Sequence, residues 1–442
     1  MKLLKEYLAS HGDDERHFSE IVNILKQYDE ETFSEAIKLI PKDMLGDVAL
    51  ELPDRYFDDM VESLEVDDLT EAVKELESDD QVDFMQELQE HDAKMASEVF
   101  ENLDKDDQDE ITLLQSYAEN EAGSYMQVEV FTATEDEIVQ DVINRFSKLK
   151  KSNELENVHN LFITTKNGVL LYSIDLDDLL TFDFQKTFEE NIEESEENFE
   201  PIIAFDTDDI KDVVSSFKEY DLFVIPVVTK NRKLIGRITS DDIHDIISEQ
   251  ATEQIYHLAG LNDEVEEDEK ILKAGKTRAT WLGINLVTAI LASFVIGLFS
   301  DTLNSMVALA VLMPIVASMG GNAGTQTLTV VVRQLTLGDI SSIDAKRIIM
   351  KEVSISLLNG FLFAIIIGTI ATIWFDIENL GFVIALSMVI NLLMAGFFGA
   401  TIPLLLERLN IDPAIGSTVI LTTVTDVVGF FSFLGLATII LF

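Results

Sequence analysis

The sequence predicts a multidomain membrane protein with an all-α superhelical domain, a tandem pair of α/β units and a polytopic α-helical transmembrane domain with five helices. Three observations predict this class. At 442 residues the chain is too long for one hydrophobic core. Most charged residues lie before Ala279, and five apolar runs long enough to cross a bilayer follow. Residues 164–180 align without a gap on residues 228–244, which indicates an internal repeat.

The charge of the chain is strongly negative and unevenly distributed. The formal net charge is −50 at pH 7, and nearly all of it lies before Ala279. Such an excess repels nucleic acid and attracts cations, so we expect no nucleic-acid partner and favour metal binding. A solvated acidic surface is the alternative. The absence of cysteine from the sequence excludes disulfides and thiolate metal sites.

Residues 1–122 are predicted to form an acidic α-superhelical N domain. They consist of short amphipathic segments separated by Pro-Asp or Asp-Asp pairs, as in IPKDML, LPDRYF and LEVDDL. This spacing suits a short helix followed by a capping turn, with Asp as the N-cap. Stacked short helices form a superhelix, whose handedness the sequence leaves open. Because the N-terminal stretch lacks the apolar run of a signal peptide, we expect the N-terminus to stay in the cytoplasm.

The internal repeat predicts two α/β units, at residues 123–185 and 186–249. Each copy contains a strand, a Lys-Asn turn, a second strand and an Asp-Asp pair that begins a helix. Residues 187–201, between the two copies, are acidic and are predicted to be a solvated loop.

Residues 250–278 are predicted to connect the soluble part to the membrane. We expect one long helix over residues 246–274, ending in a set of basic residues, Lys270, Lys273, Lys276 and Arg278. Basic residues before a membrane helix mark the cytoplasmic side.

Residues 279–442 are predicted to form the transmembrane domain. Its expected spans are residues 281–299, 303–332, 355–375, 380–406 and 414–442. Basic residues fall in alternate loops, on the same side as the connector, which predicts a cytoplasmic N-terminus and an external C-terminus.

Asp426 is the single ionisable residue of the last span. Placing a carboxylate in the middle of a membrane helix costs about 2.5 to 3.5 kcal/mol, so an ion or proton site is the default interpretation. Thr418, Thr422, Thr425 and Gly429 recur at helical spacing on the same side and predict a pore wall. The alternative is that the threonines bond to their own helix and that Asp426 pairs with a buried partner.

The second span is rich in residues that loosen helices: Pro314, Gly320, Gly321, Asn322, Gly324 and Gln326. We expect a helix broken at depth, because freed backbone groups can then meet water or ions in a cavity. Close packing of helices through small residues is the alternative. The side chains of Asn322 and Gln326 favour the cavity.

The motifs GGNAGTQ in the second span and DPAIGSTVILTTVTDVVG in the fifth resemble those of the MgtE family of magnesium channels. The resemblance covers essentially the whole chain, in the order acidic N domain, tandem CBS pair, connecting plug helix and five-helix membrane domain. It implies a homodimer in the inner or plasma membrane of a prokaryote, with a pore on the two-fold axis. Mg²⁺ would be both the transported ion and the regulator, while a preference over Mn²⁺ or Co²⁺ stays open.

The resemblance also implies roles for particular residues. Asp426 falls on the family's pore aspartate, whereas Thr418 and Thr422 stand where the compared members carry asparagine and alanine. Gln250 and Gln254 stand where those members carry acids. The cytosolic magnesium sites map onto Glu35, Asp67, Glu71, Asp242, Asp245, Glu253 and Asp412.

Two regulatory expectations follow from the resemblance. Acidic groups repel one another until divalent ions bridge them, so high internal Mg²⁺ would close the channel. Gly236, Thr239 and Asp242 have the spacing that many CBS pairs use for an adenine nucleotide, which makes ATP a second candidate ligand. The first copy carries Tyr172 and Asp175 at the matching positions.

Two other functional classes compete with a channel. A secondary transporter coupled to Na⁺ or H⁺ would also need an aspartate at mid-membrane. An enzyme is not expected, because no nucleophile motif is present and the six histidines form no pair at ligand spacing: His11, His17, His91, His159, His244 and His257.

Overall fold

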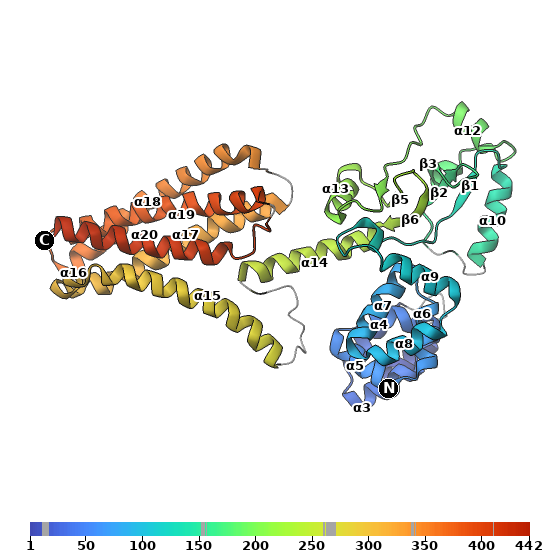
Figure 1. Cartoon of the computed structure of the whole chain (residues 1–442), viewed down its shortest axis with the longest axis horizontal. Helices are drawn as coiled ribbons and strands as arrows, with labels where there is room; N and C mark the ends of the chain where they lie inside the picture. The colour runs from blue at the N-terminus through green and yellow to red at the C-terminus, as the bar shows by residue number, and fades with distance from the viewer. Residues whose placement is uncertain are drawn as a thin grey trace. The chain divides into compact units, whose positions relative to one another are not determined.

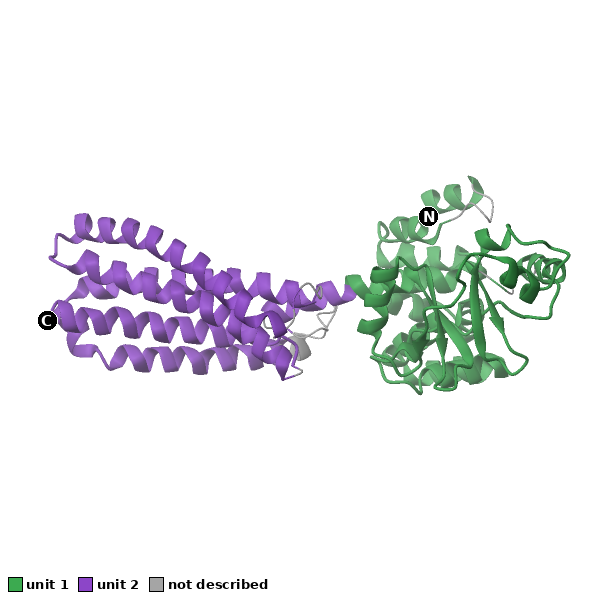
Figure 2. Ribbon diagram, turned by 90° about the horizontal axis from the view of Figure 1, so that it is seen from above, with its two compact units in different colours: residues 1–248 green, residues 249–442 purple. Residues whose placement is uncertain are grey.

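The computed structural model describes residues 1–10, 17–151, 155, 157–259, 261, 271–336, 340, 342–409 and 411–442, of which 54, 271–274, 277 and 342 are described in backbone only. The chain forms two compact units, Met1–Ser248 and Glu249–Phe442, which Figure 2 distinguishes by colour. The predicted class of a multidomain membrane protein is confirmed, while the finer domain boundaries stay predictions.

Short helices make up the first part of unit 1, as predicted. Asp29 caps one of them by accepting a bond from the Thr32 amide at 3.0 Å, and Asp92 caps another. Phe33, Phe57 and Phe84 lie fully buried in the core between the helices. The elements are α1 (Lys2–Ser10), α2 (Phe18–Leu25), α3 (Glu30–Ala36), η2 (Ile37–Leu39), η3 (Lys42–Met44), α4 (Leu45–Leu50), α5 (Asp54–Ser63), α6 (Val66–Lys74), α7 (Ser78–His91), α8 (Ala93–Asn102) and α9 (Lys105–Leu114).

The repeat forms two three-stranded sheets of the same topology, with orders β1-β2-β3 and β4-β5-β6. In each sheet the first two strands are parallel and the last two antiparallel. The two turns pair with each other, because the Leu170 amide bonds the Arg232 carbonyl and the Leu234 amide bonds the Gly168 carbonyl. The elements are η4 (Ala122–Ser124), β1 (Thr132–Thr134), α10 (Val139–Lys151), β2 (Asn160–Thr164), β3 (Leu170–Asp175), α11 (Leu176–Leu179), α12 (Phe188–Glu194), β4 (Ala204–Phe205), α13 (Ile210–Tyr220), β5 (Val224–Val228), β6 (Leu234–Thr239) and α14 (Ser240–Ala259).

Two local expectations for the soluble part and its connector were wrong. The acidic segment after Thr187 contains a helix, α12, because Thr187 and Glu190 form a capping box. The single helix expected over residues 246–274 is instead two, since α14 ends at Ala259 and α15 (Ile271–Gly297) begins at Ile271. The Leu261 amide bonds the Tyr256 carbonyl at 2.9 Å, a bond that closes the end of α14. Lys270 and the side chain of Lys273 lie outside the described residues.

Five helices in the described part of unit 2 are long and apolar enough to cross a membrane, as predicted. They are α15, α17 (Val307–Thr336), α18 (Ala345–Phe375), α19 (Leu380–Arg408) and α20 (Ser417–Ile440), joined in part by the short α16 (Ser300–Ser305) and η5 (Ser342–Asp344). The candidate span of α15 begins at Arg278, inside that helix. α19 packs against α17, α18 and α20, which Figure 1 shows side by side.

The expected break in the second span is absent, because α17 continues through Pro314 and the glycines. The glycines serve close packing instead. A methyl group at Gly320 would clash with the Asn391 amide, and one at Gly324 would approach Leu421 within 3.0 Å. The Asn391 side chain also donates to the Val316 carbonyl at 2.8 Å. An unbroken helix keeps most backbone groups bonded internally, as a bilayer requires.

Candidate functional site

A cavity of about 370 Å³ in unit 2 contains Asp426. Three helices line it, namely the end of α14, the middle of α15 and the first half of α20. Among the lining residues, all of them described, there is no lysine or arginine that could pair with the carboxylate. The lining residues are His257, Leu258, Ala259, Asn285, Thr288, Ala289, Gly416, Thr418, Val419, Thr422 and Asp426.

The predicted polar stripe of α20 divides between two faces of the helix. Thr418 and Thr422 line the cavity with Asp426. Thr418 donates to the Leu258 carbonyl at 2.9 Å, whereas Thr422 donates to the carbonyl of Thr418 at 2.8 Å. Thr425 is fully buried and donates to the Leu421 carbonyl of its own helix, and Gly429 lies against Asn391. The structure therefore places Thr425 and Gly429 in the packing of the bundle and not in the cavity.

Asn322 and Gln326 do not line this cavity. Both side chains are exposed on α17 in the single chain, and the Asn322 amide lies 3.4 Å from the Ser318 hydroxyl. Their predicted place in a pore stays a prediction.

A candidate metal site adjoins the cavity. Glu253, His257 and Asp412 each offer a ligand atom, and these atoms lie within 4.8 Å of one another. Nδ1 of the buried His257 is 3.2 Å from Oδ2 of Asp412, whose other oxygen accepts the Ala414 amide at 2.7 Å. Glu253 and Asp412 were predicted, but His257 was missed. Its spacing of four residues from Glu253 on one helix could have indicated it.

A second acidic cluster lies within unit 1 around Asp242. The Asp242 carboxylate accepts the Thr239 amide at 3.2 Å and the Thr239 hydroxyl at 2.7 Å. Burial, followed by repulsion from Asp242, raises the pKa of Asp79 well above its ordinary value and that of Asp80 to about 7. Oδ1 of Asp79 is buried without a hydrogen-bond partner among the described residues. Neither Asp79 nor Asp80 was predicted as a site residue.

The other predicted regulatory residues are exposed and more dispersed. Glu35 lies on α3, Asp67 and Glu71 on α6, and Asp245 on α14. Lys42 lies 3.8 Å from Glu71 and 2.9 Å from Asp68, so this part of α6 has a cation beside it. Neither three-ligand group that the described residues form includes Glu35, Asp67, Glu71 or Asp245.

The predicted nucleotide residues form the turn from β6 into α14. A methyl group at Gly236 would meet the Gln127 carbonyl at 2.7 Å, so the chain is tightly packed there. The hydroxyl of Thr239 is buried and already donates to Asp242. A ligand at Gly236, Thr239 and Asp242 would have to displace these contacts, and its binding stays a prediction.

Comparison with known proteins places the chain in a family. The family model for MgtE, a divalent cation transporter, matches residues 313–436. The model for the MgtE intracellular N domain matches residues 16–120, and that for the CBS domain matches residues 198–249. A magnesium transporter MgtE of Bacillus subtilis (strain 168) is 30% identical over 330 residues, which are 74% of this chain and 71% of the relative. The chain belongs to the MgtE family.

Two further similarities accompany this assignment. A magnesium transporter MgtE of Thermus thermophilus is 29% identical over 343 residues, or 77% of this chain and 74% of that protein. A crystal structure of the cytosolic domain of an Mg²⁺ channel MgtE in complex with ATP is 25% identical, with a TM-score of 0.48, and the match covers 53% of this chain and 91% of that one. Membership of the MgtE family confirms the predicted resemblance. It also confirms the expectation that the chain is a transporter and not an enzyme.

Proposed function

We propose that the chain is a channel that imports Mg²⁺ down its electrochemical gradient through a passage containing Asp426. The observation that carries the proposal is the cavity in unit 2, where a carboxylate, three threonines and an asparagine line a shared space without a lysine or arginine among the lining residues. Family relatives named as magnesium transporters support the choice of ion.

The size of the cavity suits a hydrated ion. Mg²⁺ dehydrates reluctantly and keeps several of its waters when proteins bind it. Six waters of about 30 Å³ each take up about 180 Å³, which the cavity of about 370 Å³ can hold. Asp426 supplies charge, while Thr422 and Asn285 supply oxygen atoms that can accept bonds from the ion's waters.

We propose that two copies of the chain form a homodimer with the passage at their interface. Asn322 and Gln326 support this arrangement, because both are exposed on a membrane-spanning helix of the single chain. Polar side chains that face lipid are costly, and a second copy would cover them and bring two Asp426 carboxylates to one axis.

We propose that the end of α14 acts as a gate within unit 2. His257, Leu258 and Ala259 form one wall of the cavity, and the bond from Thr418 to Leu258 holds that wall against α20. A divalent cation bound by Glu253, His257 and Asp412 would tie the same segment to the start of α20. Occupancy of this site by cytosolic Mg²⁺ would therefore favour the closed passage.

Further acidic groups strengthen this feedback. Divalent ions would relieve the repulsion among Asp79, Asp80 and Asp242. Additional weak sites for these ions are proposed at Glu35, Asp67, Glu71 and Asp245. Moving the closed fraction from 1 to 99 per cent requires about 5.5 kcal/mol of differential binding, which several weak sites can share.

The proposed orientation places the N-terminus in the cytoplasm and the C-terminus outside the inner or plasma membrane of a prokaryote. Basic residues support it: Lys276 precedes the first span and Arg278 begins it, Arg333 lies in the last turn of α17, and Lys346 and Arg347 lie in the first turn of α18. Five spans then put the two ends of the chain on opposite sides. We keep residues 1–122, 123–185, 186–249, 250–278 and 279–442 as the proposed domains.

Mg²⁺ flux into liposomes containing the purified chain tests the proposal. Asp426→Asn should abolish flux, whereas Asp376→Asn, at the exposed left-handed end of α18, should leave it unchanged because Asn tolerates that conformation. Retained flux in Asp426→Asn would remove this residue from the pathway. Single-channel recording separates the proposed channel from a carrier coupled to Na⁺ or H⁺, because only the channel gives unitary conductance steps.

A further inference from the structure

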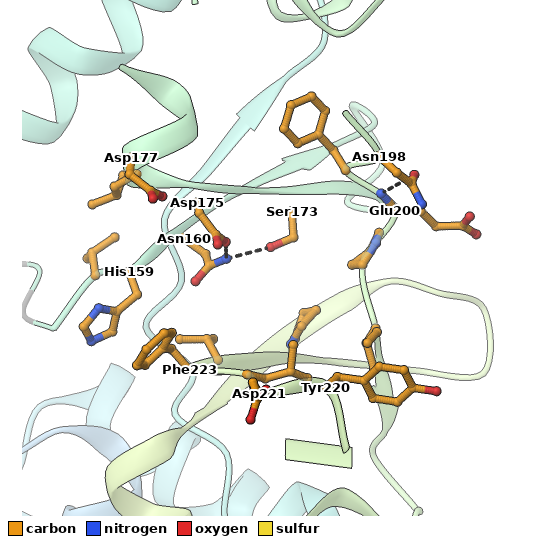
Figure 3. A pocket seen from close by; sticks show the side chains of 18 residues that line it. His159, Asn160, Ser173, Asp175, Asp177, Asn198, Glu200, Tyr220, Asp221 and Phe223 are labelled. Carbon is orange, nitrogen blue, oxygen red and sulfur yellow. Dashed lines mark hydrogen bonds between the residues drawn. The ribbon is translucent and has the colours of Figure 1, made fainter. Parts of the chain in front are cut away.

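Cations are scarce in this chain, and most of those in the membrane half lie close together in the sequence. Only five lysines and arginines follow Ala279, and four of them fall within residues 333–351. Elsewhere acids prevail: a cavity of about 540 Å³ in unit 1, whose lining residues are all described, contains four carboxylates and no lysine or arginine (Figure 3). A surface that attracts anions is therefore unusual in this protein. The four cations are Arg333, Lys346, Arg347 and Lys351.

Apolar packing fixes these cations at one end of the membrane bundle. Val331 of α17 and Ile348 of α18 are buried in one apolar cluster with residues of α19. Arg333 lies two residues beyond Val331, and Lys346 and Arg347 directly precede Ile348. The core that holds the two helix ends together therefore also fixes the backbone of these cations, whose side chains are exposed.

The positive charge at the start of α18 is not neutralised within the part of the chain that the structure describes. α18 has no acidic residue in its first turn, and the side chain of its N-cap, Asp344, makes no capping bond. Neither Lys346 nor Arg347 forms an ion pair with a described residue, whereas Lys351 lies 3.9 Å from Glu352. Cations at a helix N-terminus are unfavourable, because that end of the helix is itself positive. An external anion would remove this cost.

The cationic face of α18 continues directly into an apolar one. Residues three or four positions apart share a face of a helix, and Arg347, Lys351, Ile355, Leu358 and Leu362 follow one another at this spacing. The apolar members are 45%, 73% and 54% exposed, in that order. α18 lies at the edge of the bundle in Figure 1 and packs mainly against α19, so this face is uncovered in the single chain. A charged end that leads into an apolar stripe matches the two parts of a phospholipid.

Charge decides between a lipid and a second copy of the chain as the molecule that covers this face. In a two-fold interface the same patch meets itself, so the cations of one copy would face those of the other at a cost in energy. A phospholipid instead brings a phosphate, which Lys and Arg bind well, together with acyl chains for the apolar stripe. Clusters of basic residues next to a membrane helix attract anionic lipids in this way.

We propose that Lys346, Arg347 and Lys351 hold the headgroup of one anionic phospholipid, whose acyl chains lie along Ile355 and Leu358. This is a defined site for one class of lipid, distinct from the general contact that any membrane helix makes with a bilayer. Lipid bound there would stabilise the end of the bundle at which α17 and α18 meet. The site rests on the face of α18 alone and requires neither that the chain conduct Mg²⁺ nor that it have a particular orientation.

Native mass spectrometry of the full chain in detergent, titrated with phosphatidylglycerol or phosphatidylcholine of equal chain length, tests this proposal. The first phosphatidylglycerol should bind at least about tenfold more tightly than the first phosphatidylcholine. Lys346→Gln with Arg347→Gln should weaken phosphatidylglycerol binding about tenfold or more. The matched control is Lys276→Gln with Arg278→Gln, which removes the same two residue types near the start of the first membrane span and should leave this affinity unchanged.

The apolar stripe provides the second arm and separates a lipid from a free phosphate. Leu358→Ser should weaken phosphatidylglycerol binding about threefold through lost apolar contact, whereas Ile373→Ser, 78% exposed at the far end of α18, should not. Glycerol 3-phosphate at the concentration of the lipid should not displace it, because it carries the charge without the acyl chains. All of the substituted residues are exposed, so the variants are expected to fold.

Four results would each overturn the proposal. They are equal affinity for the two lipids, equal loss of affinity in the two paired Gln variants, indifference to Leu358→Ser, and displacement of the lipid by glycerol 3-phosphate. Equal loss in the paired variants would mean that any cation near the membrane attracts the lipid, and displacement would mean that the cations bind phosphate alone.

Discussion

The Thr418 hydroxyl donates a hydrogen bond to the Leu258 carbonyl at 2.9 Å, although 160 residues separate the two along the chain. This bond fixes the end of α14 against the helix that carries Asp426. It is a direct polar contact between the proposed gate and the proposed pathway. It involves a threonine at one of the two positions where the sequence departs from the compared family members.

Removing this bond should weaken closure. In Thr418→Val the side chain keeps its shape but loses the hydroxyl, at a cost of about 1 kcal/mol. We expect the ratio of closed to open channels to fall about fivefold, so that flux at high internal Mg²⁺ rises. Flux into liposomes preloaded with Mg²⁺ measures this. Thr423→Val is the control, because Thr423 donates only to the Val419 carbonyl of its own helix in the described contacts, and equal effects of both variants would contradict the gate.

His257 should make the proposed regulatory site favour transition metals. A nitrogen ligand binds Mn²⁺ and Co²⁺ better than Mg²⁺, whose preferred ligands are oxygens. We expect Co²⁺ to close the channel at lower concentration than Mg²⁺, and His257→Gln, which offers an oxygen, to remove most of that difference. Inhibition of flux by each ion on the cytoplasmic side gives the comparison. Unchanged metal preference in His257→Gln would exclude the imidazole as a ligand.

Asn285 should contribute to conduction from α15. It lines the cavity with Asp426, and its carbonyl can accept a bond from a hydrated ion. Losing one such bond in Asn285→Leu is worth about 0.5 to 1.5 kcal/mol, so flux should fall about two- to tenfold. Ser293→Ala provides the control on the same helix, since Ser293 bonds the Ala289 carbonyl and does not line the cavity.

Gly320 should be intolerant of substitution. A methyl group there would clash with the Asn391 amide, whereas one at the neighbouring Gly321 would meet nothing within 4 Å. We expect Gly320→Ala to destabilise the membrane unit by about 1 to 3 kcal/mol and Gly321→Ala to cause no loss. Thermal unfolding in detergent distinguishes them. Asn391→Ala combined with Gly320→Ala should recover part of the loss, and a purely additive double variant would argue against this contact.

Unit 1 should lose stability as pH rises because of Glu110. Burial, followed by repulsion from Glu129, raises the pKa of Glu110 to about 7. The folded chain therefore holds a proton that the unfolded chain has released from about pH 4.5 upward, so stability falls between pH 4.5 and 7 and stays lower above. Because Glu110 is only partly buried, we expect Glu110→Gln to gain only about 1 kcal/mol at pH 8 and little at pH 5. Circular dichroism melts of the full chain test this, with Glu101→Gln as the exposed control.

Asp426 could be predicted as a site residue from the sequence alone, because it is the single ionisable residue in a long apolar span. The same reasoning placed Thr425 with Thr422. The two separate in the structure because α20 packs against α15, α17 and α19, and helical spacing alone does not say where these neighbours lie. The glycines of α17 show the same limit, since their partner Asn391 belongs to another helix.

The missed site residues depend on contacts between distant parts of the chain. His257 gains its role from Asp412, 155 residues later. Asp79 and Asp80 look like an ordinary helix start until burial and Asp242 act on them. The repeat predicted two α/β units but not how the two copies pack against each other, which the hydrogen bonds between their turns show.

The position of α15 has a mechanical consequence. Only 11% of the apolar stretch of α15 is buried in the single chain, compared with 56% for α19. The candidate span of α15 has 20 residues and is therefore about 30 Å long, which is the thickness of an average hydrocarbon core. Packing within the single chain therefore constrains this helix less than it constrains α19. Since Asn285 and Thr288 reach the cavity from α15, a thicker or thinner bilayer would move one wall around Asp426, so that membrane composition itself would tune the passage.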